Sequence, residues 1–215
     1  TTFGDELKDA GSAISEAYSS VAAGLQFSTE SGTPKALLVT STQPSEGKSS
    51  TALALAQNFA RRGSRVLLVD GDLRKPSFRA ASDEIGLTPL LTNDDELAGH
   101  VTGTQYDGLW LLPCGPLPPN PADLLATPRF ATIIEASFDI VIIDAPPVLG
   151  LADVPLLGSA AGSVLFVVES GNTRTRSAIE ALNRIEASGA HVLGAVLAKS
   201  KERDRAYDYH SYRYG

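Results

Sequence analysis

The length and composition are those of a globular protein. The chain has 215 residues, of which 43 % are hydrophobic and 20 % charged, and these proportions exclude a chain that is disordered throughout. The formal net charge is −7, which argues against a general nucleic-acid-binding protein because the surface of such a protein should be basic. The length suffices for one sizeable domain.

Cysteine and histidine usage argues against disulfide and zinc chemistry. The single cysteine, Cys114, cannot form an internal disulfide and suits a reducing cytosol. The histidines, His100, His191 and His210, do not have the spacing of zinc ligands. The apolar runs are too short to span a membrane, and no signal-peptide pattern opens the sequence. We therefore expect a cytoplasmic protein. Because the sequence starts at Thr1 and contains no methionine, we interpret it as a piece of a longer chain.

The first predicted element is an amphipathic helix over residues 11–26. Ile14, Tyr18, Val21 and Leu25 recur at spacings of four, three and four, which places them on one face of a helix. This apolar stripe must pack either on the domain itself or on a partner.

Short apolar runs farther along the chain predict buried strands. They are rich in Val, Ile and Leu without polar alternation, as is typical of strands buried on both faces of a parallel sheet. The runs are Ala36–Val39, Val66–Val69, Leu109–Leu112, Ile140–Ile143, Val164–Val168 and Val192–Leu197. Helix-length segments separate most of them, and two of these, Ser50–Arg62 and Arg174–Ser188, end at a glycine. The alternation predicts an α/β fold with a doubly wound, mostly parallel sheet flanked by helices.

The segment from Thr40 to Ser50 (TSTQPSEGKSS) joins the first predicted strand to a helix. Such a loop presents backbone N–H groups and the positive end of the helix dipole to an anion. It fits the phosphate-binding pattern G-x-x-x-x-G-K-[ST], except that Thr42 stands at the first glycine. Lys48 would then reach the β- and γ-phosphates of ATP, and Ser49 would bind Mg²⁺. The residues expected to bind the nucleotide are Ser45, Glu46, Gly47, Lys48, Ser49 and Ser50. The alternative is an ordinary loop that contains Gly-Lys-Ser.

Aspartates end two of the predicted strands. Asp70 and Asp72 follow the second strand, and Asp144 ends the fourth. Ligands of open α/β sheets bind outside the carboxyl ends of the strands. Three carboxylates at that edge would repel one another unless a cation lay among them, and Mg²⁺ that arrives with ATP is the natural cation. The alternative is that each Asp caps a helix or a turn. That alternative would be favoured for one Asp, but not for three beside a phosphate loop.

With these motifs the sequence resembles the bacterial tyrosine kinases that accompany capsule and exopolysaccharide export. The phosphate loop resembles the Walker A motif of that family, VDGDLRKP (residues 69–76) its Walker A-prime motif, and DIVIIDAPP (residues 139–147) its Walker B motif. GPLPPNPADLL (residues 115–125), the region of Asp153 and the tail tyrosines are also similar to family segments. The likeness covers nearly the whole chain. It implies a P-loop NTPase fold of the deviant-Walker, MinD-like type.

The resemblance implies an ATP-dependent tyrosine autokinase that regulates polymerisation and export of capsule or exopolysaccharide. Lys48 would hold the phosphates, and Ser49, Asp72 and Asp144 would position Mg²⁺. Asp70 would accept the proton of a tyrosine hydroxyl, whose pKa of about 10 makes such help necessary. The implied phosphoacceptors are Tyr207, Tyr209, Tyr212 and Tyr214. Residues 1–198 would form the kinase domain, and residues 199–215 a flexible tail.

The resemblance also implies partners. These are a membrane-anchored activator, fused or separate, that holds the domain at the inner face of the plasma membrane, a tyrosine phosphatase, and further copies of the chain; no nucleic acid is expected. The family motif Glu-x-x-Arg-x-x-Arg, used for ring assembly, reads Glu16, Ser19 and Ala22 here, so we expect weak self-association. An asparagine that often follows the last strand is Ala198, which predicts altered recognition of the base.

Two other functions fit part of the pattern. A partition or cell-division-positioning ATPase would share the fold, but its signature lysine five residues before the Walker lysine is Gln43 here, and such ATPases lack a tyrosine-rich tail. A nucleotide-sensing regulator that phosphorylates nothing stays open, because a site can degrade on a kept fold. The intact Lys48, Asp72 and Asp144 count against that alternative.

Overall fold

The core of the molecule is a seven-stranded sheet with the order β3-β4-β2-β5-β1-β6-β7. The structure is a computed structural model that describes residues 7, 9, 11–30, 32–78, 82 and 84–200. Neighbouring strands are parallel except for the antiparallel pair β3 and β4. The strands are β1 (Ala36–Ser41), β2 (Val66–Asp70), β3 (Thr102–Gly103), β4 (Leu109–Leu112), β5 (Ile140–Asp144), β6 (Ser163–Glu169) and β7 (His191–Ala198). The predicted α/β fold is confirmed, and β3 is the strand that the sequence did not predict.

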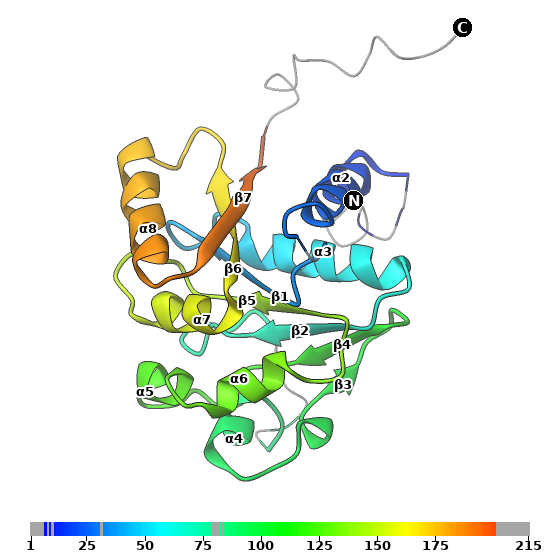
Figure 1. The fold of residues 1–215 in the computed structure, drawn as a ribbon, viewed down its shortest axis with the longest axis vertical. Coiled ribbons are helices and arrows are strands. Elements are labelled where there is room, and N and C mark those ends of the chain that lie inside the picture. The colour runs from blue at the N-terminus through cyan, green and yellow to red at the C-terminus, as the bar shows by residue number, and fades with distance from the viewer. Residues whose placement is uncertain are drawn as a thin grey trace, which may run out of the picture.

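Helices cover both faces of the sheet (Figure 1). They are α2 (Ala13–Leu25), α3 (Lys48–Arg61), α4 (Leu87–Thr92), the 3₁₀ turn η1 (Leu97–Gly99), α5 (Pro121–Leu125), α6 (Arg129–Ile134), α7 (Asp153–Ala161) and α8 (Thr175–Ala187). Side chains of α2 and α3 pack on one face, and side chains of α4 to α8 pack on the other. Successive residues of β1 enter different cores, since Leu37 belongs to the α3 side and Leu38 to the α7 side. This burial on both faces explains why the strands lack polar alternation.

The predicted N-terminal helix packs on its own domain. Ser12 caps α2, because its hydroxyl accepts the Ser15 N–H at 3.1 Å. Leu25 is buried, and Tyr18 and Val21 pack against the core on the α3 side. The Tyr18 hydroxyl lies 3.1 Å from the Thr51 Oγ1 of α3. Of the two alternatives left open by the sequence, the structure therefore selects the domain itself for these three members of the stripe.

Strand register brings the acidic strand ends together. β1 lies between β5 and β6, and β2 pairs with β5 so that Asp70 is opposite Asp144. Gly71 permits this close approach, because its N–H donates to the Asp144 carbonyl at 2.8 Å. A Cβ at position 71 would lie 3.1 Å from that oxygen and 3.0 Å from Ile143 Cγ2.

Within the described part of the chain, no helix is both long and apolar enough to cross a membrane.

Gly71→Ala should destabilise the domain by about 1–3 kcal/mol, because the added methyl group must displace the backbone of β5. Gly24→Ala is the matched control. Gly24 lies on the exposed side of α2 with nothing within 4 Å of an added Cβ, so this change should stabilise the helix by about 0.5–1 kcal/mol. Urea denaturation measures both. Equal stability of Gly71→Ala and the wild type would contradict the close packing of β2 and β5.

Candidate active site

The predicted phosphate loop borders a pocket of about 420 Å³ at the carboxyl edge of the sheet. Gly47 precedes α3 with φ of 102°, a left-handed conformation that suits glycine. The lining residues are Pro44, Ser45, Gly47, Lys48, Ser49, Ser50, Asp72, Arg74, Lys75, Pro76, Ser77, Pro147, Leu151 and Lys199. Five of the six predicted nucleotide-binding residues therefore line one pocket.

Glu46 is the exception, and its side chain shapes the loop. Its carboxylate is buried and accepts the Gln43 N–H at 2.9 Å and the Thr173 hydroxyl. Thr42, which replaces the first glycine of the phosphate-binding pattern, is fully buried, and its carbonyl accepts the Leu149 N–H. A side chain at position 42 thus packs inward and does not line the pocket.

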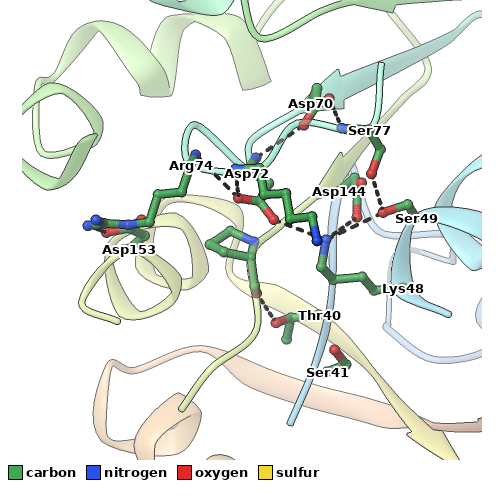
Figure 2. A network of polar contacts seen from close by, with 12 residues as sticks. Thr40, Ser41, Lys48, Ser49, Asp70, Asp72, Arg74, Ser77, Asp144 and Asp153 are labelled. Carbon is green, nitrogen blue, oxygen red and sulfur yellow. Dashed lines mark hydrogen bonds and ion pairs between the residues drawn. The ribbon is translucent and has the colours of Figure 1, made fainter. Parts of the chain in front are cut away.

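The Lys48 ammonium group lies among acidic and hydroxyl oxygens (Figure 2). Its Nζ is 3.2 Å from Asp72 Oδ2, 3.6 Å from Asp144 Oδ1 and 3.4 Å from Ser49 Oγ. Both carboxylates are almost completely buried, and so is the lysine. Two buried carboxylates this close together need a counter-ion, because burial strengthens the repulsion between them. Lys48 supplies that positive charge.

Asp144 has oxygens that the protein leaves without hydrogen bonds. The side chain is fully buried, and neither carboxylate oxygen accepts a hydrogen bond from the described residues. Burial raises the pKa of Asp144, and the nearby Lys48 charge partly opposes that rise. The 3.6 Å ion pair with Lys48 offsets the cost of burying this charge only in part. These oxygens are therefore suited to a cation.

The oxygens around Lys48 fit a magnesium ion that arrives with phosphate. Mg²⁺ prefers oxygen ligands and keeps several waters, so one or two carboxylates suffice when phosphate completes the shell. Asp72, Asp144 and Ser49 offer such oxygens around one ammonium group. Among residues that the structure describes, no cluster of three or more His, Cys, Asp or Glu side chains could hold a metal alone. The site matches an ion shared with a nucleotide.

Asp72 also fixes the backbone of the segment that follows β2. Its Oδ1 accepts the N–H groups of Arg74 at 3.3 Å and Lys75 at 2.9 Å. Its Oδ2 is left to face Lys48. The side chain thus links the pocket wall at Arg74 and Lys75 to the phosphate loop.

Asp70 is held by backbone donors of the segment that follows β2. It is fully buried, and its two oxygens accept the backbone N–H groups of Asp72, Ser77 and Phe78 at 2.7–3.2 Å. Burial raises the pKa of Asp70 to about 7, and the Asp144 charge adds to the rise, whereas these backbone donors lower it. A tyrosine hydroxyl could reach this carboxylate only if the segment from Gly71 to Phe78 moved. Its role as proton acceptor stays a prediction.

An ion pair that the sequence does not predict borders the pocket. Arg74 binds Asp153 through Nε at 2.7 Å and Nη2 at 3.0 Å, and Asp153 is fully buried. The pair joins the segment after β2 to the first turn of α7 (Figure 2). The sequence also gives no indication that the Ser77 hydroxyl donates to Ser49 Oγ at 2.7 Å. The two residues of each pair lie far apart in the sequence, so no local spacing predicts the contact.

A second, more apolar pocket of about 570 Å³ adjoins the first. It lies between α2 and β7 and is lined by Ile14, Ala17, Tyr18, Val21, Gly47, Ser50 and residues 195–200. Gly47, Ser50 and Lys199 belong to both linings. The two pockets therefore meet at the start of α3. The predicted phosphoacceptors Tyr207, Tyr209, Tyr212 and Tyr214 lie outside the described residues.

A strand, a phosphate loop and a helix that starts with a buried lysine, beside two acidic strand ends, define a P-loop nucleotide-binding domain. Residues 37–212 match the family model described as the CobQ/CobB/MinD/ParA nucleotide binding domain. The chain is 34 % identical over 203 residues to the tyrosine-protein kinase YwqD of Bacillus subtilis, and the match covers 91 % of this chain and 86 % of that protein.

A solved structure and a longer relative agree with this match. The crystal structure of the chimerical protein CapA2B2 superposes with a TM-score of 0.84 and 33 % identity, covering 92 % of this chain and 90 % of that one. The tyrosine-protein kinase wzc of Salmonella typhimurium is 31 % identical, over 93 % of this chain and 29 % of that protein. The chain belongs to the family of bacterial tyrosine-protein kinases.

Arg74→Met should destabilise the domain because it leaves the buried Asp153 carboxylate unpaired. We expect a loss of about 1–3 kcal/mol, less than for a fully buried pair, because 41 % of the Arg74 side chain is exposed. Asp153→Asn should cost less, and the double variant should show favourable coupling in urea denaturation.

Arg65→Met is the control for this ion pair. It removes the ion pair of Arg65 with Asp139, in which both side chains are about half exposed, and it should leave stability unchanged. If Arg74→Met behaved like this control, the Asp153 ion pair would have no structural role.

Proposed function

We propose that this chain is an ATP-dependent protein-tyrosine kinase that phosphorylates Tyr207, Tyr209, Tyr212 and Tyr214 of its own tail, on a second copy. The observation that carries the proposal is the buried Lys48 shared by Asp72 and Asp144 beside the phosphate loop. This arrangement suits transfer of a phosphoryl group, for which positioning and charge stabilisation supply most of the catalysis. The proposal that the acceptor is tyrosine rests on family membership, since YwqD and wzc are named tyrosine-protein kinases.

The nucleotide would occupy both pockets. Its phosphates would lie against Ser45, Gly47, Lys48, Ser49 and Ser50, with the backbone of Glu46 completing the loop. Its base would enter the second pocket, because Gly47 and Ser50 line both cavities. There Ala198 stands where an asparagine is common in the family, and Tyr18 and Val21 supply apolar wall. Recognition of the base would thus rest more on packing than on hydrogen bonds.

Lys48 would exchange partners when the nucleotide binds. Its ammonium group can turn from Asp72 and Asp144 to the β- and γ-phosphates, which would leave both carboxylates free to hold a cation. Ser49, Asp72 and Asp144 would then hold Mg²⁺, which when bound neutralises charge on the phosphates. The Asp144 oxygens favour this assignment, because they pair with Lys48 but accept no hydrogen bond from the described residues.

Asp70 is proposed as the acceptor of the tyrosine proton. A carboxyl group whose pKa is about 7 is matched to proton transfer near neutral pH. Because its oxygens hold three backbone N–H groups, the acceptor tyrosine would have to displace part of the segment after Gly71. Because the tyrosine would reach Asp70 only after this displacement, proton transfer would require that the tail bind first.

The partners follow from the family in the same way. We propose that a membrane-anchored activator, fused or separate, holds the domain at the inner face of the plasma membrane, and that a phosphatase reverses the modification. The kinase would regulate polymerisation and export of capsule or exopolysaccharide. Self-association would be weak, because Ala22 is buried and the Ser19 hydroxyl accepts a hydrogen bond from Asn58 of α3 at 2.7 Å. Neither position offers a charged contact to a neighbour.

Transfer between copies can be tested with a Lys48→Met chain that keeps its tail tyrosines. Mixed with an active chain whose four tail tyrosines are Phe, it should acquire phosphotyrosine, detected by mass spectrometry. Incubated alone it should acquire at least about a hundredfold less, because the phosphates lose their buried cation. A folded Lys48→Met chain that stays unmodified in the mixture at high concentration would exclude transfer between copies.

Asp70→Asn and Asp72→Asn should fail in different ways. Asp70→Asn should slow transfer by roughly 10²–10⁴-fold while Mg·ADP affinity stays within about threefold of the wild type. Asp72→Asn should raise the Mg²⁺ concentration needed for half-maximal rate. Single-turnover rates and calorimetry at several Mg²⁺ concentrations separate the two. A full rate of Asp70→Asn would remove its role as proton acceptor, and an unchanged Mg²⁺ requirement of Asp72→Asn would remove its role at the metal.

A further inference from the structure

Two residues that line the phosphate pocket, Ser45 of the loop and Lys199 after β7, share an unusual backbone conformation. Within the described part of the chain, Ser45 (φ 68°) and Lys199 (φ 55°) are the non-glycine residues with positive φ. Left-handed backbone is unfavourable for residues with a Cβ and persists where surrounding contacts impose it, often at functional sites. These two residues are 154 positions apart, yet Lys199 Nζ donates to the Ser45 carbonyl at 2.6 Å. The contact joins the phosphate loop to the end of β7.

Lys199 is itself held from the end of β6. Its Nζ lies 3.1 Å from Glu169 Oε1. The Asn172 amide and the Lys199 ammonium group hold the pKa of Glu169 below its usual range. The Glu169 N–H donates to Thr173 Oγ1 at 2.9 Å, and the Thr173 hydroxyl in turn donates to Glu46. Hydrogen bonds from Lys199 and Thr173 thus hold the loop at two adjacent residues, at the carbonyl of Ser45 and at the carboxylate of Glu46.

Lys199 contacts the loop through a carbonyl group and not through its N–H groups. With the Ser45 carbonyl drawn toward Lys199, the N–H groups that follow are left for an anion in the pocket. The end of β7 also touches the loop, since a Cβ at Gly47 would lie 3.3 Å from the Cβ of Ala198. The shape of the phosphate cradle therefore depends on contacts from β6 and β7 that lie outside the Walker segments.

We propose that Lys199 is a positioning residue that holds the phosphate loop in its binding shape and so sets nucleotide affinity. Its ammonium group is engaged by a carbonyl and a carboxylate, so it acts through Ser45 and not on the reacting phosphoryl group. The inference rests on the proposed nucleotide site, but it does not require that the phosphoryl group go to tyrosine.

Lys199→Met tests the proposal through binding. Mg·ADP affinity, measured by calorimetry, should fall roughly ten- to hundredfold, because a charged hydrogen bond to the loop is lost. KM for ATP should rise in parallel while kcat stays within about threefold. Lys199→Arg should recover most of the affinity. The control Arg184→Met removes an exposed pair with Glu180 on α8 and should leave affinity unchanged.

Ser45→Gly provides the sharper test, because glycine adopts φ near 68° without the steric cost of a Cβ. If Lys199 holds Ser45 in that conformation, Lys199→Met should weaken Mg·ADP binding less in the Ser45→Gly background than in the wild type. In the nucleotide-free protein, Lys199→Met should also speed hydrogen exchange of the amides of residues 44–50. Equal effects in both backgrounds would overturn the proposal, as would unchanged affinity, or a fall in kcat at constant KM.

The same measurements separate this inference from the kinase proposal. A wild-type chain that binds Mg·ADP and forms no phosphotyrosine, with the loss and coupling just described, would refute the kinase and support the role of Lys199. If the wild-type chain forms phosphotyrosine and the Lys199→Met variant binds Mg·ADP normally, the kinase proposal is supported and the role of Lys199 is refuted. A wild-type chain that binds neither Mg·ADP nor Mg·ATP would contradict both.

Discussion

The burial of Lys48 between two aspartates is the interaction on which the rest of the site depends. Parallel pairing of β2 with β5 sets Asp70 opposite Asp144, and Asp72 follows two residues later, so three carboxyl groups meet where water is largely excluded. Their repulsion would be severe without a cation. Lys48, the first residue of α3, places one charge within 3.6 Å of both Asp72 and Asp144. The phosphate loop, Gly71 and the ends of β6 and β7 can be understood as the parts that keep this lysine and its acceptors in place.

This arrangement connects charge balance to function. In the proposed function, a nucleotide would bring negative phosphates to the loop, and Asp72 and Asp144 would hold a divalent cation, so the buried charges would be redistributed without being left unpaired. In the structure, Asp72 holds the segment after β2 with one oxygen and faces Lys48 with the other. Binding of a nucleotide would therefore affect that segment through Asp72. The same segment carries Arg74 and the backbone donors to Asp70.

The sheet and the phosphate loop were predictable because both leave local patterns. Strands buried on both faces are unbroken apolar runs, and the loop lies between a strand and a helix with Gly47 and Lys48 at fixed spacing. β3 escaped prediction because its two residues are too few to form a pattern. Arg74–Asp153 and Ser45–Lys199 escaped because their partners meet only after the chain has folded. The roles of Asp70 and of the tail tyrosines stay predictions.

In the proposed function, the buried charge cluster serves phosphoryl transfer to tyrosine and not nucleotide sensing or hydrolysis alone. Mass spectrometry of the purified chain after incubation with Mg·ATP tests it most directly. We predict phosphate on Tyr207, Tyr209, Tyr212 or Tyr214, formed only when both Mg²⁺ and ATP are present. A chain that binds or hydrolyses Mg·ATP at any concentration yet leaves every tyrosine unmodified would contradict it.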